Sequence, residues 1–337
     1  MTPAPALGIV VGGDLREQAA LAREAEEAGF ESVWCAETAR SAFVQAAVLA
    51  GATRRILVGT AVALAFPRSP TLTAMAARDV AELSDGRFVL GLGTQVKGVM
   101  ERRFGLAFEH PAAKVAEAVE VIRAVWAAFG GTPIDHRGRF YTVTLAPFPG
   151  AGPAPGPIPV YLAAVNERMA ETAGRVADGV CGHPMTSPEY VRQVVRPAVE
   201  RGANAAGRNP GHVSVTTNLI VQVSRDREMA KTEAALQLGF YGTTRSYGPV
   251  LALHGFEGLI GPLRRAFAQG DMAGMGRLAM PLVDTFALAG TPDEVREGLA
   301  AYHGLADRVI LGSAWVGPEP NVLRERFGLL LETFRAT

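Results

Sequence analysis

The stretch VGTAVALAFPRSPTLTAMAARDVAELSDGRFVLGLGT, residues 58–94, decides the fold class. Apolar runs over residues 56–64 and 88–92 predict two buried strands, because each run is short and bounded by turn residues. Between them, apolar residues recur at the spacing of one helical face, which predicts an amphipathic helix. The residues of that face are Leu72, Met75, Ala76, Val80 and Leu83. Strand, helix and strand in this order are typical of a parallel sheet with crossover helices.

The same alternation continues on both sides of this stretch. Helices are expected over residues 15–28 and 114–129, and a hydroxyl followed by proline marks helix starts at Ser69, Ser187 and Thr291. The other strands are expected at residues 7–11, 32–36, 160–164, 179–182, 213–223 and 308–311. Eight strand–helix units favour an α/β fold of the closed TIM-barrel type over an open doubly wound sheet.

Residues 1–337 are expected to form a single domain, because the alternation resumes after every interruption. Three insertions interrupt it, at about residues 95–111, 130–159 and 240–280. The second contains the proline-rich run APFPGAGPAPGPIP, which suits neither a helix nor a central strand. The third is mixed and glycine-rich, and its Tyr241 and Tyr247 are equally consistent with an apolar pocket lid and with plain packing or a dimer interface.

Composition and charge exclude several classes of protein. With 33 Lys plus Arg against 33 Asp plus Glu, the chain lacks the basic excess of a nucleic-acid-binding protein. We find neither a signal peptide nor an apolar run long enough for a membrane span. The 2 cysteines are too few for a disulfide framework, and no histidine pair has the spacing of a zinc site. We therefore expect a cytoplasmic protein without a bound metal.

Candidate site residues follow the expected strands, because the loops after barrel strands carry the chemistry in this fold. Glu37 could orient a cofactor or move a proton, or it could be a solvated loop carboxylate. His183 could be catalytic or a satisfied core histidine. The other polar or aromatic residues in such places are Thr38, Arg68, Thr94, Gln95, Lys97, Asn166, Ser313 and Trp315.

Two further motifs allow more than one interpretation. The run Leu90-Gly91-Leu92-Gly93 lacks the third glycine of a dinucleotide-binding fingerprint, since Val96 stands in its place, so close packing at a strand end explains it better. Arg102 and Arg103 could hold a phosphate or carboxylate tail, or they could lie on a solvated helical face.

Residues 58–94 resemble the central signature of the luciferase-like flavin and deazaflavin oxidoreductases: a strand, an Arg-x-Pro turn, a helix, Ser-x-Gly-Arg-Phe and a Gly-Leu-Gly strand. AGFESVWCAE (28–37), AAVNERMAETAGRVADGV (163–180) and AGTPDEV (289–295) are similar to further motifs of that family, in the same order. GTQVKGVMERRF (93–104) resembles an actinobacterial subgroup that uses the deazaflavin coenzyme F420.

The resemblance implies a TIM barrel with the cofactor ring across its carboxyl-end mouth. A cis peptide and a bulge behind the ring would fall at Ala61 and Val62, and Glu37 would lie beside the ring. The resemblance also implies cofactor contacts along the loops after the fourth and fifth strands. Those residues are Thr94 and Gln95 beside the cofactor, and Val165, Asn166, Arg168 and Met169 near its phosphate at a helix N-terminus.

The activity that the resemblance implies is hydride transfer between coenzyme F420 and a small organic substrate, in a homodimer. His183 would be the proton donor or substrate anchor, and Arg102 or Arg103 would hold the anionic tail of the cofactor. Thr38 and Val96 stand where the family's sugar-phosphate dehydrogenases carry a histidine and a glutamate, so glucose-6-phosphate is rejected as substrate. Alternatives are an FMN-dependent monooxygenase supplied by a partner reductase, and a non-catalytic partner subunit of the same fold.

Overall fold

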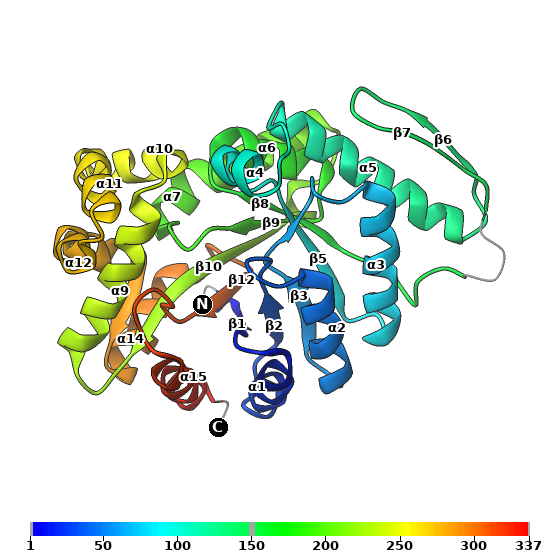
Figure 1. The fold of residues 1–337 in the computed structure, drawn as a ribbon. Helices are drawn as coiled ribbons and strands as arrows, with labels where there is room; N and C mark the ends of the chain where they lie inside the picture. Colours follow the sequence, from blue (N-terminus) through cyan, green and yellow to red (C-terminus); the bar gives the residue numbers. More distant parts are fainter. Residues whose placement is uncertain (1–2, 148–151, 336–337) are drawn as a thin grey trace.

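A closed ring of eight parallel strands forms the centre of the computed structural model, which describes residues 3–147 and 152–335 (Figure 1). Its members are β1 (Ala6–Val10), β2 (Ser32–Cys35), β3 (Leu57–Thr60), β5 (Phe88–Gly93), β8 (Val160–Ala164), β9 (Gly179–Gly182), β10 (Ser214–Val223) and β12 (Arg308–Gly312). The ring closes because β10 pairs with both β9 and β12. The expected TIM barrel is therefore confirmed.

Helices lie around the strands in the alternating order that the sequence predicts (Figure 1). Ser69 and Ser187 accept hydrogen bonds from the first helical turn, and Thr291 forms a capping box with Glu294. The helices that cover the barrel are α1 (Leu15–Glu27), α2 (Ala42–Ala52), α3 (Pro70–Leu83), α5 (Pro111–Phe129), α6 (Glu167–Val176), α7 (Pro188–Tyr190), α8 (Arg196–Ala205), α9 (Arg227–Gly242), α13 (Val283–Phe286), α14 (Pro292–Leu299) and α15 (Pro320–Phe334).

The interior of the barrel is filled by a cluster of its own, separate from the larger core between strands and helices. Its buried members are Trp34, Val89, Tyr161, Cys181 and Ile310. Bulky side chains from alternate strands fill TIM barrels in this way, so the barrel is a packed core with no pore. Any ligand site in such a fold must lie above this cluster, at one end of the ring.

Glycines admit the close approach of neighbouring strands beside the interior. A Cβ atom on Gly91 would lie 1.8 Å from the backbone oxygen of Thr60, and one on Gly93 would lie 2.3 Å from the Val62 side chain. The packing interpretation of the Gly-Leu-Gly run is therefore confirmed. Strand β5 can lie against the end of β3 because it carries no side chain at these two positions.

The predicted buried face of α3 is right for Val80 and wrong for its larger members. Leu72, Met75 and Leu83 are 57, 40 and 50% exposed. The helix instead buries a neighbouring face made largely of small residues, namely Thr73, Ala74, Ala77, Val80 and Ala81. Small side chains allow α3 to pack closely on β5 and on helices α2 and α5, and that packing outweighs the stronger hydrophobicity of the leucines.

The three insertions have defined structure that the sequence did not indicate. The first contains α4 (Lys97–Arg103), and the second contains an antiparallel hairpin of β6 (Ile134–Arg137) and β7 (Thr142–Leu145). Part of its proline-rich run, residues 148–151, lies outside the described residues. The third is helical, with α10 (Gly248–Leu253), α11 (Ile260–Ala268) and α12 (Met272–Ala279). A short strand β11 (Ala287–Gly290) extends the sheet beside β10, and β4 (Ala63–Leu64) pairs with β5.

The β6–β7 hairpin is fastened to α5 by Glu117. This carboxylate accepts backbone N–H groups of Phe140 and Tyr141 at 3.0 and 2.7 Å, and it lies 3.3 Å from His136 Nε2. Burial opposes its ionisation, but these hydrogen bonds outweigh burial and lower the pKa of Glu117.

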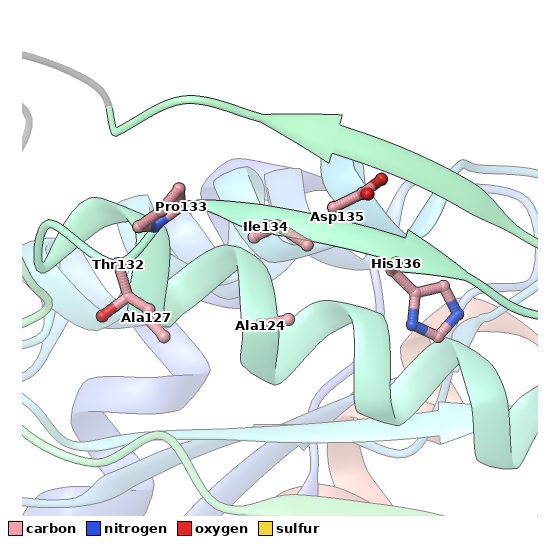
Figure 2. A pocket seen from close by; sticks show the side chains of 7 residues that line it. All are labelled: Ala124, Ala127, Thr132, Pro133, Ile134, Asp135 and His136. Carbon is pink, nitrogen blue, oxygen red and sulfur yellow. The ribbon is translucent and has the colours of Figure 1, made fainter.

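A groove of about 280 Å³ runs between α5 and β6 on the outside of the barrel, and Figure 2 shows it. It lies away from the strand ends.

Within residues 3–147 and 152–335, no helix is both long enough and apolar enough to cross a lipid bilayer.

We predict that Gly91→Ala destabilises the barrel by about 1–3 kcal/mol, since backbone is what the new methyl group would meet. Gly51→Ala is the matched control, because Gly51 lies in α2 with no atom near its would-be Cβ. It should stabilise the protein by about 0.5–1 kcal/mol. Urea unfolding followed by circular dichroism measures both. Equal midpoints for Gly91→Ala and the unmodified protein would contradict the close packing.

Candidate active site

Residues that the sequence singled out gather at the carboxyl end of the barrel. Glu37, Thr94, Asn166, His183 and Trp315 come shortly after β2, β5, β8, β9 and β12, and these strands are parallel members of one ring. The carboxyl end is where TIM barrels build their sites. Residues as far apart in the sequence as Glu37 and Trp315 are thereby brought to one rim.

An interruption between β3 and β4 forms part of this rim. The peptide bond between Ala61 and Val62 is cis, as the family resemblance implies. Ala61 N–H donates to Cys35 O at 2.7 Å, and Glu37 N–H donates to Val62 O at 3.2 Å. Ala61 and Val62 are half-buried and pack on the interior cluster. They present a small apolar surface at the mouth.

The carboxylate of Glu37 holds this interruption in place. It forms a two-pronged ion pair with Arg68 and accepts the N–H groups of Leu64 and Ala42 at 2.8 and 3.3 Å. Its side chain is 9% exposed. The four donors join β4, the start of α2 and the loop before α3. In this structure Glu37 is a positioning residue, and its contact with a cofactor ring stays a prediction.

The imidazole of His183 lies among uncharged partners. Its Nδ1 accepts the N–H of Met185 at 3.2 Å, and its Nε2 lies 2.8 Å from the hydroxyl of Tyr247. The ring stacks on Tyr247 with centroids 4.4 Å apart, and the Tyr241 ring meets it edge-on at 4.7 Å. Burial lowers the pKa of His183 to about 3, so the ring is neutral near pH 7. Because Nδ1 accepts the Met185 N–H, we assign the single proton of the neutral ring to Nε2.

An aromatic wall beside His183 comes from the third insertion and from the loop after β12. Phe240 lies 5.5 Å from Trp315 and 5.8 Å from Tyr241, measured between ring centroids. The sequence left the tyrosines of this insertion open between lid and packing. Their contact with His183 is decided by tertiary structure, and the only signal for it was the aromatic content of residues 240–247.

The N-terminus of α6 is capped by Asn166. The Oδ1 atom of Asn166 accepts the N–H of Met169 at 3.1 Å. Asn166 and Arg168 are exposed, Val165 is half-buried and Met169 is buried. The first-turn N–H groups and the helix dipole make this terminus compatible with an anion. Phosphate binding by these residues stays a prediction.

The cationic residues after β5 differ in whether their charged groups already have a partner within the protein. Lys97 pairs with Glu101 at 3.7 Å, and Arg103 donates to the carbonyl of Thr38. Arg102 is exposed and folds back over Gly98, without an acidic partner among the residues that the structure describes. Of these three cations, Arg102 therefore has the guanidinium most available for an external anion.

Thr94 and Gln95 lie where β5 passes into α4. Gln95 has a left-handed backbone with φ of 59°, and its side-chain oxygen accepts the N–H of Val96 at 3.0 Å. Thr94 donates to the Gln95 carbonyl at 3.3 Å. These hydrogen bonds lie within the turn itself. The side-chain amide nitrogen of exposed Gln95 is available to bind a ligand at the mouth.

Metal binding has no support in the described part of the chain, where no group of three His, Cys, Asp or Glu could hold an ion. Both cysteines are buried free thiols, and burial raises the pKa of Cys35 to about 12 and that of Cys181 to about 11. Neither thiol is a nucleophile at neutral pH.

Comparison with known proteins identifies the family. Residues 2–308 match the model of the luciferase-like monooxygenases, and the chain belongs to this family. An uncharacterized protein of Mycobacterium tuberculosis is 36% identical over 310 residues, covering 88% of this chain and 91% of that protein. The 5,10-methylenetetrahydromethanopterin reductase of Archaeoglobus fulgidus is 29% identical over 303 residues, covering 88% of each.

A solved structure shows the same fold. The coenzyme F420 dependent tetrahydromethanopterin reductase from Methanopyrus kandleri superimposes with a TM-score of 0.83 at 22% identity, covering 99% of this chain and 98% of that one. The chain is thus a luciferase-like oxidoreductase in family, with a TIM-barrel fold.

We predict an energetic coupling of about 1–3 kcal/mol between Glu37 and Arg68, because their charged hydrogen bonds are largely shielded from water. A double-mutant cycle with Glu37→Gln and Arg68→Gln, measured by urea unfolding, gives this value. The exposed pair of Asp135 and Arg137 is the control, and Asp135→Asn with Arg137→Gln should show a smaller coupling. Additive losses for Glu37 and Arg68 would contradict the bracing role.

We predict that His183 stays neutral from pH 8 down to pH 5, as ¹⁵N NMR of labelled imidazoles would show. Its folded pKa of about 3 lies below the unfolded value of 6.5, so only the unfolded chain gains a proton as the pH falls between these values. The stabilisation is complete above pH 6.5 and is lost toward pH 3. His183→Gln should therefore flatten the acid limb of the stability profile. An imidazolium signal at pH 6 would contradict this.

Proposed function

We propose that the protein is a coenzyme F420-dependent oxidoreductase that transfers a hydride between the deazaflavin and a small organic substrate. The observation that carries this is the apolar surface of Ala61 and Val62 at the carboxyl end of the barrel, braced by Glu37. Relatives whose names include F420-dependent or methanopterin reductases, with the shared fold, support the choice of cofactor.

The described residues fit such a cofactor in three respects. A flat ring finds apolar atoms at Ala61 and Val62, a phosphate finds the N-terminus of α6, and an anionic tail finds the guanidinium of Arg102. When bound, a deazaflavin supplies or accepts a hydride at a ring carbon. The residues proposed to hold it are Ala61, Val62, Thr94, Gln95, Arg102, Val165, Asn166, Arg168 and Met169.

A second candidate is an FMN-dependent monooxygenase that receives reduced flavin from a partner reductase. The family model, which is that of the luciferase-like monooxygenases, favours it. The two candidates differ in what they do with oxygen, because reduced FMN activates oxygen whereas a deazaflavin lacks the ring nitrogen that supports one-electron chemistry. Oxygen uptake in the presence of reduced FMN therefore separates them.

We predict that the apoprotein quenches the fluorescence of coenzyme F420 on titration and binds FMN more weakly. Arg102→Gln should raise the dissociation constant of F420 about tenfold, through loss of a charged contact of about 1.4 kcal/mol. Arg55→Gln is the matched control, since exposed Arg55 lies before β3, at the opposite end of the barrel, and should leave binding unchanged.

Tighter binding of FMN, with oxygen uptake, would favour the monooxygenase instead. If neither F420 nor FMN binds, the proposed function fails, and the non-catalytic partner subunit becomes the better explanation.

A further inference from the structure

Tyr247 is a buried phenol at the carboxyl end of the barrel. It ends a single 3₁₀ turn, Arg245–Tyr247, in the insertion between α9 and α10, and its side chain contacts His183 directly after β9. The residue is 8% exposed. Its ring lies nearly parallel to the imidazole, at an interplanar angle of 25°, so both its position and its orientation are defined by packing.

The hydrogen bonds around His183 determine where the phenol proton points. The N–H of Met185 occupies Nδ1, so this nitrogen is an acceptor and the neutral ring carries its proton on Nε2. The Nε2 proton is therefore donated to the Tyr247 oxygen, 2.8 Å away. Tyr247 accepts this bond, and its own O–H proton must point elsewhere.

The structure offers no acceptor for that proton within its described residues, where His183 is the one hydrogen-bond partner of the Tyr247 hydroxyl. A buried donor without a partner loses its hydration with nothing in return, and proteins rarely leave one unpaired. At the site end of a barrel, an external acceptor is the natural partner. The His183 and Tyr247 pair therefore marks a place for a ligand atom with a lone pair.

The surroundings indicate what kind of ligand this is. Among the described residues, His183 contacts the backbone N–H of Met185 and the side chains of Tyr241 and Tyr247, and none of these groups carries a charge. Burial raises the pKa of Tyr247, with Tyr241 adding to the effect, so the hydroxyl remains a protonated donor at neutral pH. A neutral donor within an aromatic wall suits an uncharged acceptor on an apolar body.

We propose that the Tyr247 hydroxyl binds the carbonyl oxygen of the substrate, with His183 as the positioning residue that orients it. This deepens the proposed oxidoreductase function and rests on it, and it names an uncharged carbonyl compound as the substrate class. The hydrogen bond polarises the carbonyl group toward addition at carbon. His183 acts through Tyr247 and does not itself touch the substrate.

Tyr241 provides a matched control in the same wall. Burial raises the pKa of its hydroxyl, with Trp315 and Gln237 opposing the effect, and Tyr241 meets His183 through a T-shaped contact of the two rings. Tyr241→Phe and Tyr247→Phe both keep an aromatic ring against His183 and each remove one oxygen. The proposal requires that they differ in carbonyl binding.

The test uses acetophenone labelled with ¹³C at its carbonyl group, bound to protein loaded with oxidised F420. Isotope-edited infrared difference spectra should show a C=O band at lower wavenumber than in the free probe. Tyr247→Phe should abolish this shift and weaken probe binding about tenfold, whereas Tyr241→Phe should retain the shift and bind within about twofold. Thermal unfolding of each variant checks that the fold is intact.

Proton NMR of the His183 ring supplies a second measurement that does not depend on the probe. The proposal requires a proton on Nε2 in the unmodified protein and the same tautomer in Tyr247→Phe. A proton on Nδ1 would overturn the positioning role.

The outcomes separate the two levels of the proposal. A shifted band lost only in Tyr247→Phe, with normal F420 titration, supports it. No shifted band in the unmodified protein, or a shift that persists in Tyr247→Phe, overturns it while F420 binding leaves the proposed function standing. Absence of F420 binding in every variant overturns the proposed function, and the substrate role of Tyr247 with it.

Discussion

The carboxylate of Glu37 is the constraint on which the mouth of the barrel depends. Strand β3 breaks at Ala61, two residues before the chain returns to the sheet as β4, and the two sides of the break must be held together. The carboxylate of Glu37 does this by binding Leu64, Ala42 and Arg68, while its own N–H donates to Val62 O. Gly91 then lets β5 lie against the same break. An ion pair and a missing side chain thus keep a small apolar surface open above a filled interior.

The rest of the site divides into two electrostatic regions. On one side, the start of α6 and the exposed Arg102 favour negative charge. On the other, His183 and the aromatic wall are neutral, and burial holds the histidine uncharged. An anionic cofactor tail and an uncharged substrate would bind in different places. The tail would therefore lose its water beside positive charge, and the substrate would lose its water beside uncharged groups.

Sequence periodicity predicted the strands well, because a barrel strand is buried on both faces and reads as a short apolar run. It failed for α3, where Leu72 and Met75 suggested the wrong face. A helix packs by shape as well as by hydrophobicity, and small residues such as Ala74 and Ala77 permit the closer contact. The helices of residues 240–280 were missed because glycines and short lengths obscure their period.

The sequence by itself determined the alternation of strands and helices, the caps at Ser69 and Ser187, and the order in which polar residues follow the strands. Each depends on neighbours within a few residues. Only the tertiary structure decided that Glu37 forms an ion pair with Arg68. It also decided that Tyr247 contacts His183, which lies 64 positions away in the sequence. Such contacts depend on barrel closure and on how an insertion folds back over the strand ends. Neither can be predicted from the few residues that surround each position in the sequence.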